Sequence, residues 1–188
     1  MGRAAIGLYY GSSTCYTEMA AEKIQRILGM DVVDLHNVAT TGLTSMDDYR
    51  QLILGIPTWD YGELQEDWEA VWDQLDTIDF SDKTVALFGL GDQIGYPEWF
   101  LDAMGYLYNK VLLNGAKIIG YWPNSNYHFT ESQALTTDKS HFVGLALDDE
   151  NDFELTDERL QRWCNQLRRQ FENVPRQQPE NSTTNNNS

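Results

Sequence analysis

The chain has 188 residues, of which 41% are hydrophobic, and this length favours one domain with a substantial core over two. Its 29 acidic and 13 basic residues give a formal net charge of −16, so nucleic acid and anionic membrane surfaces are unfavourable partners because like charges repel. No apolar run approaches the roughly 20 residues of a spanning helix, the start does not resemble a signal peptide, and the two cysteines form no metal or dithiol motif. We therefore expect a monomeric cytoplasmic protein without a bound metal.

Apolar segments alternate with amphipathic ones along the chain. In chain order, the sequence predicts a strand at 3–10, a helix at 17–28, strands at 31–36 and 51–57, a helix at 62–76, a strand at 83–91, a helix at 98–115, a strand at 117–122, a resumed strand at 141–147 and a helix at 156–171. The first strand lacks polar alternation, which is typical of strands buried on both faces. The helix at 62–76 places Trp68 and Trp72 on an apolar stripe, so both are expected core residues.

Strands that alternate with helices at this spacing predict βαβ crossovers and an α/β domain whose parallel sheet is covered on both faces. Residues 123–140 are polar and turn-rich, and we expect a loop inserted between two pieces of an edge strand. Thr156 is the expected N-cap of the last helix. The tail at 175–188 is polar and of low complexity, so we expect disorder there, outside a domain that spans 1–174.

Ligands of open α/β sheets bind at the carboxyl ends of the strands, which directs attention to the loops after the first, third and fourth strands. The first of these loops carries Ser12, Ser13, Thr14 and Thr17 at the start of a helix. Hydroxyl and main-chain N–H donors in such a place suit a phosphate group. A hydroxyl-rich helix cap explains one or two of these residues but not four, and the Walker A and GxGxxG patterns are absent.

Aromatic side chains stand in the second and third loops. Trp59 lies at the tip of the loop at 57–63, outside any helical stripe, and Tyr96 lies in the glycine-rich loop at 89–99 together with Asp92. Glycine lets the backbone of that loop approach a ligand closely. Together with the phosphate loop, these rings predict a planar aromatic ligand that is held between two side chains and carries a phosphate.

Three segments of the sequence resemble the three FMN-binding loops of flavodoxins: GSSTCYTE, GIPTWDYGELQEDW and FGLGDQIGYPEWFLDA. The stretches NYHFTESQAL and FVGLALDDEN resemble the insertion that divides the fifth strand of long-chain flavodoxins, and the similarity runs from about residue 4 to residue 173. Within the family, the amino-acid sequence of these segments is most similar to that of flavodoxins of enteric and related bacteria. The resemblance implies a three-layer sandwich with a five-stranded parallel sheet in the order 2-1-3-4-5, formed by one FMN-binding domain at 1–174.

The resemblance also implies a role for individual residues. The FMN phosphate would be bound by Ser12, Ser13, Thr14, Cys15, Tyr16 and Thr17. The isoalloxazine ring would contact Thr58 and Trp59 on its inner face, Tyr96 on its outer face, Asp60, Tyr61 and Gly62 near N5, and Leu90, Gly91 and Asp92 at its pyrimidine edge. Two residues depart from the family pattern. Cys15 replaces a common glycine, which raises the question whether that position needs a positive φ, and Trp99 replaces a smaller polar residue at the rim.

These implications predict a low-potential one-electron carrier with tightly but non-covalently bound FMN. Neutral donors around the phosphate and acidic residues around the ring would disfavour the negative charge that reduction adds. The family implies an NADPH-dependent flavodoxin/ferredoxin reductase and low-potential redox enzymes as partners. Their docking face would be acidic and formed by Glu63, Glu66, Asp67, Glu69 and Asp73, although a solvated helix surface explains the same residues. The alternative function is an FMN-dependent quinone reductase-type enzyme, and a receiver-type signalling module is disfavoured because YYGSS contains no acidic residue.

Overall fold

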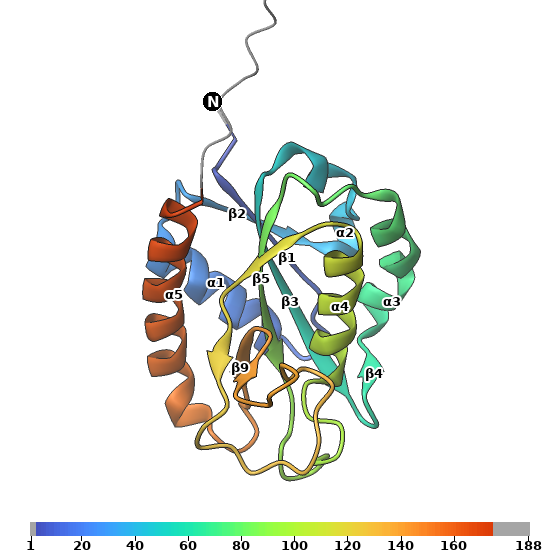
Figure 1. Ribbon diagram of the computed structural model, residues 1–188, viewed down its shortest axis with the longest axis vertical. Helices are drawn as coiled ribbons and strands as arrows, with labels where there is room; N and C mark the ends of the chain where they lie inside the picture. Colours follow the sequence, from blue (N-terminus) through green and yellow to red (C-terminus); the bar gives the residue numbers. More distant parts are fainter. Residues whose placement is uncertain (1–2, 175–188) are drawn as a thin grey trace, which may run out of the picture.

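The computed structural model in Figure 1 describes residues 3–174, so the disorder predicted for 175–188 concerns residues outside the described range. A central sheet lies between two layers of helices, as predicted. Its main strands are β1 (Ile6–Tyr10), β2 (Val33–Asn37), β3 (Gln51–Trp59), β5 (Thr84–Leu90), β6 (Lys117–Ile119) and β9 (Leu145–Leu147). All six pair in parallel, in the order β2-β1-β3-β5, with β6 and β9 both on the outer side of β5. The predicted order 2-1-3-4-5 is confirmed when β6 and β9 count as one strand.

The three central strands are apolar because both of their faces are covered. Every residue of β1 and β5 is buried. In the register of the sheet, Leu8 lies beside Ile53, and Ile53 lies beside Ala86. A sheet with two apolar faces needs a helical layer on each, which fixes the three-layer arrangement.

Helices α1 (Tyr16–Leu28) and α5 (Thr156–Glu172) cover one face of the sheet, and α3 (Glu66–Val71) and α4 (Asp102–Leu113) cover the other (Figure 1). The smaller elements are α2 (Val38–Thr41), the 3-10 helices η1 (Thr44–Asp48), η2 (Trp72–Thr77) and η3 (Phe153–Leu155), and the short strands β4 (Glu63–Leu64), β7 (Trp122–Pro123) and β8 (His141–Phe142). The carboxyl ends of the parallel strands point to the lower end of the view.

Two tryptophans connect helices of the outer layers to main-chain carbonyls of other segments. Trp68 in α3 and Trp163 in α5 are fully buried. The indole N–H of Trp68 donates to the carbonyl of Gly55 over 2.9 Å, and that of Trp163 donates to the carbonyl of Gly120 over 2.8 Å. The predicted core position of Trp68 is confirmed, whereas Trp72 at the start of η2 is only half-buried.

Three predicted helices differ from the structure. The helix predicted at 62–76 begins at Glu66, because residues 63–64 pair with β3 as the strand β4, and from Trp72 it continues as the 3-10 helix η2. The helix predicted from residue 98 begins at Asp102, because the preceding residues form turns and Leu101 has a left-handed φ of 61°. The prediction of Thr156 as an N-cap is wrong, because Thr156 is already the first helical residue and its hydroxyl donates to the Asp149 carboxylate; the N-cap position is occupied by Leu155, whose side chain accepts no hydrogen bond from the first N–H groups of α5.

The fifth position of the sheet is shared by two short strands. β6 pairs with residues 84–86 of β5, and β9 pairs with residues 88–90. Between them the chain leaves the main sheet at residues 120–144, here called the insertion, in which β7 and β8 form an antiparallel pair. Phe129 and Phe142 of the insertion pack around Phe100, with ring centroids 5.3 and 5.9 Å from it. The insertion is therefore folded against the domain rather than extended from it.

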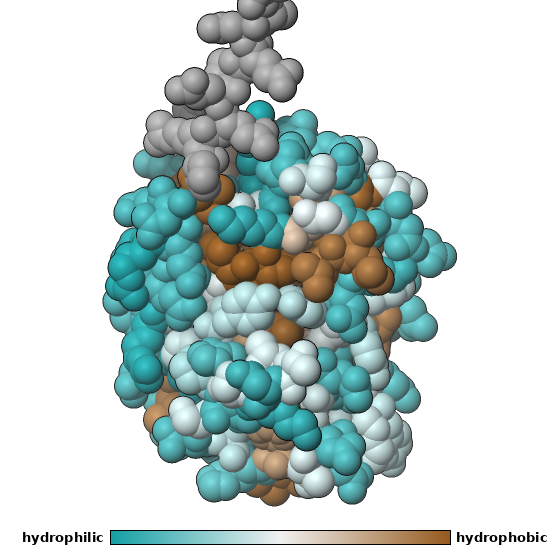
Figure 2. Space-filling model, in the orientation of Figure 1, coloured by the Kyte–Doolittle hydropathy of each residue, from teal (hydrophilic) through white to brown (hydrophobic). Residues whose placement is uncertain are grey.

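The surface is hydrophilic over most of the face seen in Figure 2, and hydrophobic side chains gather on its upper part, next to the grey atoms. At the C-terminal end of α4, Leu113 is 85% exposed. Within residues 3–174, no helix combines the length and the apolar character needed to cross a membrane.

Candidate functional site

The loops that follow β1, β3 and β5 meet at the carboxyl edge of the sheet and enclose a cavity of about 230 Å³. Its lining residues are Thr14, Tyr16, Thr17, Pro57, Thr58, Trp59, Asp60, Leu90, Gly91, Asp92, Tyr96, Asp149 and Glu150. Most of the site residues predicted from the sequence are thus brought together. The remaining ones lie in the same loops without lining this cavity: Ser12, Ser13, Cys15, Tyr61 and Gly62.

A larger hollow of about 970 Å³ lies at the opposite, amino edge of the sheet, where the first residues of β1, β3, β5 and β6 line it. It contains several basic side chains, including Arg50, Lys83 and Lys117, but none of the predicted site residues. Ligands of open α/β sheets bind at the carboxyl edge, so the smaller cavity is the better candidate site.

The first loop leads into α1 through a left-handed residue. Cys15 is the N-cap of α1 and has a φ of 68°, and its carbonyl accepts the first helical hydrogen bond from the Met19 N–H. The earlier N–H groups of a helix have no partner within it, so they are available to an anion. The position that departs from the family pattern therefore keeps the conformation that glycine favours, although a cysteine occupies it.

The Ser12 hydroxyl identifies this loop as a place for a ligand. Its oxygen is buried and, among the residues that the structure describes, has no hydrogen-bond partner. A buried polar atom without a partner costs roughly 1–3 kcal/mol, so such an atom is expected to face a group that binds it. A phosphate oxygen is a suitable acceptor beside a helix N-terminus, and the loop residues therefore fit the phosphate end of FMN.

Gln65 holds the first loop from the side, and the sequence analysis missed it. Its side chain donates to the Ser13 hydroxyl over 3.1 Å and accepts a hydrogen bond from the Trp68 N–H over 3.3 Å, which makes it the N-cap of α3. Gln65 is almost completely buried. Its place directly before the acidic first turn of α3 was the available signal for a capping residue.

We expect Cys15→Gly to raise the free energy of unfolding of the protein without FMN by about 1 kcal/mol. A non-glycine residue in the left-handed region carries strain of about 1–2 kcal/mol, part of which the greater backbone entropy of glycine in the unfolded chain cancels. Urea unfolding measures the change, and Cys15→Ala, which keeps the Cβ atom, is the matched control. If Cys15→Gly is less stable than Cys15→Ala, the strain at Cys15 does not exist.

The second loop turns sharply at the end of β3. Trp59 pairs with Glu63 of β4, and the turn between them is closed by Asp60 and Gly62, whose φ values are 40° and 83°. Tyr61 at the tip is 66% exposed and is not among the residues that line the cavity. The turn therefore brings Trp59 and Asp60 into the cavity lining.

Aromatic contacts join the second loop to the third. Tyr61 packs edge-on against Tyr96 and Trp99, with centroid distances of 5.9 and 5.1 Å. A hydrogen bond with the Asp60 carboxylate raises the pKa of the Tyr96 hydroxyl. Trp99 thus packs on the outside of Tyr61 at the rim, and the loops that carry Trp59 and Tyr96 support each other.

The third loop fixes a carboxylate at its turn. Burial opposes ionisation of Asp92, but hydrogen bonds from the Gly95 N–H, the Asn151 amide and the Ile94 N–H outweigh burial and lower its pKa. Asp92 is therefore a stable negative charge at the cavity wall. The Thr58 hydroxyl oxygen, at the opposite wall, accepts a hydrogen bond from the Ala103 N–H over 3.0 Å and so ties β3 to α4.

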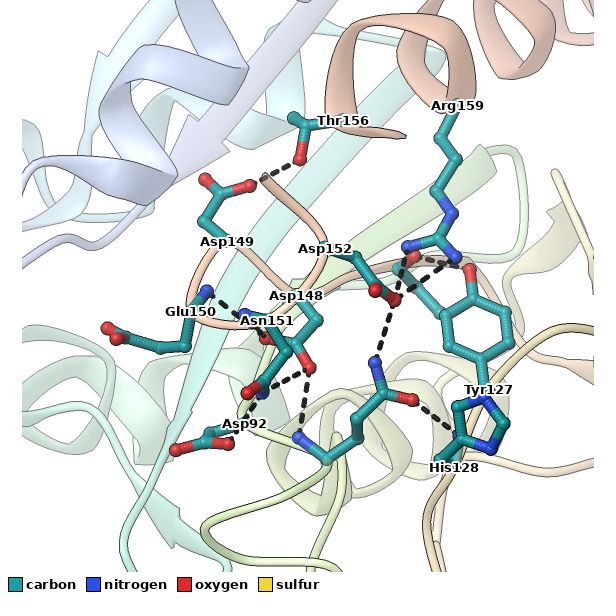
Figure 3. A network of polar contacts seen from close by, with 12 residues as sticks. Asp92, Tyr127, His128, Asp148, Asp149, Glu150, Asn151, Asp152, Thr156 and Arg159 are labelled. Atoms are coloured by element: carbon teal, nitrogen blue, oxygen red, sulfur yellow. Dashed lines mark hydrogen bonds and ion pairs between the residues drawn. The ribbon is translucent and has the colours of Figure 1, made fainter. Parts of the chain in front are cut away.

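A fourth loop, at residues 148–152 after β9 and drawn in Figure 3, also contributes residues to the cavity lining. The sequence analysis missed it because only the loops after the first, third and fourth strands were considered. Asp149 and Glu150 line the cavity. Both residues follow the carboxyl end of the predicted fifth strand, which lies at the same edge of the sheet as the other three loops, and this position could have identified them. With Asp60 and Asp92, they make four acidic residues among the described lining residues, which include no lysine or arginine.

Comparison with known proteins agrees with this geometry. The model of the family described as "Flavodoxin" matches residues 8–163. Flavodoxin 2 of Escherichia coli (strain K12) is 58% identical over 162 residues, which cover 86% of this chain and 94% of the relative. Flavodoxin of Nostoc sp. (strain PCC 7120) is 49% identical over 166 residues, which cover 88% of this chain and 96% of the relative.

A solved structure has the same fold. The crystal structure of Fusobacterium nucleatum flavodoxin bound to flavin mononucleotide matches with a TM-score of 0.82 and 33% identity, and the match covers 88% of this chain and 97% of that chain. The resemblance inferred from three loops is confirmed by the family match, by the relatives and by this structure. The chain belongs to the flavodoxin family.

Proposed function

We propose that this chain is a low-potential one-electron carrier that works through a tightly but non-covalently bound FMN. The observation that carries the proposal is the cavity at the carboxyl edge of the sheet, which Trp59 and Tyr96 both line and which the first loop, with its buried Ser12 hydroxyl that has no partner among the described residues, also lines. Bound FMN supplies the redox chemistry, which no side chain here provides by itself.

The first loop binds the phosphate of FMN, and the second and third loops bind its ring system. The phosphate is bound by Ser12, Ser13, Thr14, Cys15, Tyr16 and Thr17, through hydroxyls and main-chain N–H groups. The ring system is enclosed by Thr58, Trp59, Asp60, Tyr61, Gly62, Leu90, Gly91, Asp92 and Tyr96. Ten of these fifteen residues line the cavity, which supports the proposal, and they include Trp59 at the end of β3, Asp60 in the turn after it, and Asp92 and Tyr96 in the loop after β5.

The charges around the cavity set the direction of the reduction potential. Four acidic side chains line it without a basic one among the described lining residues. Negative charges near the ring disfavour the further negative charge that reduction adds, and they do so more strongly where water is excluded. A low potential follows from this electrostatic arrangement.

The family implies redox partners. We propose an NADPH-dependent flavodoxin/ferredoxin reductase as electron donor and low-potential redox enzymes as acceptors, all in the cytoplasm. The acidic face beside the cavity supports docking of basic partners: Glu63, Glu66, Glu69 and Asp73 are exposed, while Asp67 is half-buried and accepts a hydrogen bond from Gln65. A net charge of −16 would steer a basic partner from a distance.

Stepwise anaerobic reduction of the FMN-loaded protein, followed by absorption, tests the function. We expect two separated one-electron steps and a second midpoint potential well below that of free FMN. A single two-electron step would overturn the carrier and favour the quinone reductase-type enzyme, and failure of the apoprotein to bind added FMN would overturn both. The reductase alternative is not favoured at present, because the relatives and the solved structure reported above are all named flavodoxins.

A further inference from the structure

A buried amide side chain connects the third loop to two other parts of the molecule. Gln93 directly follows Asp92 in the loop after β5, and the residue is only 1% exposed. It does not line the cavity. A polar side chain that is buried so completely needs partners for both its N–H and its carbonyl groups, and Gln93 has them in two different segments.

The first set of partners lies in the loop after β9. The main-chain N–H of Gln93 donates to the Asp148 carboxylate over 3.1 Å, and the side-chain amide donates to the Asp152 carboxylate over 2.8 Å. Asn151, between these two residues, donates to both Asp148 and Asp92 over 2.8 Å. Figure 3 shows Asp92, Asp148, Asn151 and Asp152 gathered in one network.

The second partner belongs to the insertion. The main-chain N–H of His128 donates to the side-chain carbonyl of Gln93 over 2.5 Å. The neighbouring Tyr127 is fixed as well, because its hydroxyl donates to the Ala146 carbonyl over 2.6 Å and its ring lies 4.4 Å from the Arg159 guanidinium. Arg159 in turn contacts Asp152 over 3.4 Å, so the network closes on itself (Figure 3).

We propose that Gln93 is a positioning residue of the flavin site, through which the insertion holds the loop at 90–96 in place. The side chain binds the insertion at one end and the loop at 148–152 at the other, while its main chain continues from Gly91 and Asp92 in the cavity wall. The position of Asp92 and Tyr96 relative to the ring then depends on the insertion. This inference rests on the proposed function.

An apolar residue of the same length would not replace the amide. Methionine at position 93 would leave the His128 N–H without its acceptor and the Asp152 carboxylate without one of its donors. Loss of a partner for a buried polar group costs more than the hydrogen bond contributes, so the loop is expected to move away from both segments. The main chain of Asp92 would move with it.

Gln93→Met in the FMN-loaded full chain tests the inference. We expect the dissociation constant of FMN to increase about tenfold. We also expect the second midpoint potential to rise by about 59 mV, because the Asp92 charge is held less firmly at the ring. This shift corresponds to a tenfold change in the equilibrium constant of the second one-electron reduction. Asn124→Ala is the matched control, since it removes a hydrogen bond within the insertion, to the Lys139 carbonyl, without touching the third loop. It should leave both quantities unchanged.

A pair of variants separates positioning from a merely structural role. Gln93→Glu places two carboxylates against each other, at positions 93 and 152, and should weaken FMN binding at least as much as Gln93→Met. Adding Asp152→Asn reverses the direction of that hydrogen bond and restores the net charge, so the double variant should recover the affinity. If Gln93→Met fails to fold, the comparison of this double variant with Gln93→Glu still tests the inference.

The inference is overturned if Gln93→Met lowers the stability of the apoprotein but leaves the dissociation constant and both midpoint potentials as in the unmodified chain. It is equally overturned if the double variant folds and binds FMN no better than Gln93→Glu. Failure of the proposed function has a different signature, because the unmodified chain itself would then lack FMN or take up two electrons in one step.

Discussion

Gly11→Ala should weaken FMN binding about 100-fold, a change of about 2.7 kcal/mol in binding free energy. A Cβ atom at Gly11 would lie 2.2 Å from Gln65 Oε1 and 2.8 Å from Trp68 Cδ1. Both side chains are buried, and Gln65 caps α3 and holds Ser13. The methyl group would therefore displace the residue that positions the phosphate loop, and equilibrium titration of the apoprotein with FMN measures the effect.

The double variant Gly11→Ala with Gln65→Ala identifies the cause. If the clash with Gln65 is responsible, removing that side chain makes room for the methyl group, and the double variant binds FMN more tightly than the sum of the single changes predicts. The single variant Gln65→Ala removes the hydrogen bond to Ser13 without changing a residue of the phosphate loop, and it should weaken the binding free energy of FMN by about 1 kcal/mol. If the losses of FMN binding free energy in the two single variants simply add up in the double variant, displacement of Gln65 is not the cause of the weaker binding.

Gly144→Ala should lower the free energy of unfolding of the apoprotein by about 3 kcal/mol, the upper end for overpacking a well-packed core. A Cβ atom at Gly144 would lie 2.2 Å from the Leu87 carbonyl oxygen and 2.7 Å from its carbon, and this main chain is held in the centre of the sheet. Neither partner can move without breaking the pairing of β5 with β9.

Urea unfolding in the absence of FMN measures this loss, because bound ligand would add its own stabilisation. Gly89→Ala is the matched control on the neighbouring strand β5. Its Cβ atom would lie 3.1 Å from Met104 Cβ and Sδ and 3.3 Å from Leu101 Cδ2, and a shift of these side chains by a few tenths of an ångström, without movement of a strand, would relieve the contacts. The control should lose about 1 kcal/mol. Equal losses for the two variants would contradict the argument from a rigid main chain.

The sequence predicted the parts of the fold that depend on periodic patterns. Strands such as β1 and β5 are apolar on both faces, and the chain order of strands and helices admits few topologies. The turns before α4 have no such pattern. Leu101 adopts a left-handed conformation that its residue type does not suggest, so the start of that helix could not be placed from the sequence.

The site was predictable where chemistry is concentrated in one short segment. Four hydroxyl residues at a helix start and two aromatic rings at strand ends identify the loops that carry Ser12, Trp59 and Tyr96. Gln65 and Gln93 escaped notice because a glutamine has no distinctive signal until its partners are known. Asp149 and Glu150 escaped it because the insertion separates their short strand from the first half of the same sheet position.

Because the fifth strand is divided into β6 and β9, the pairing of the sheet does not depend on the length of the chain between these two halves. β6 ends its pairing at Ala86 and β9 begins at Phe88, so only Leu87 lies between the two paired stretches of β5. Residues can therefore be gained or lost between the halves without shifting the register of the main sheet. The entropy cost of a longer connection grows only with the logarithm of its length. This junction can accommodate new sequence during evolution or design, provided that the segment around His128, which contacts Gln93, is kept.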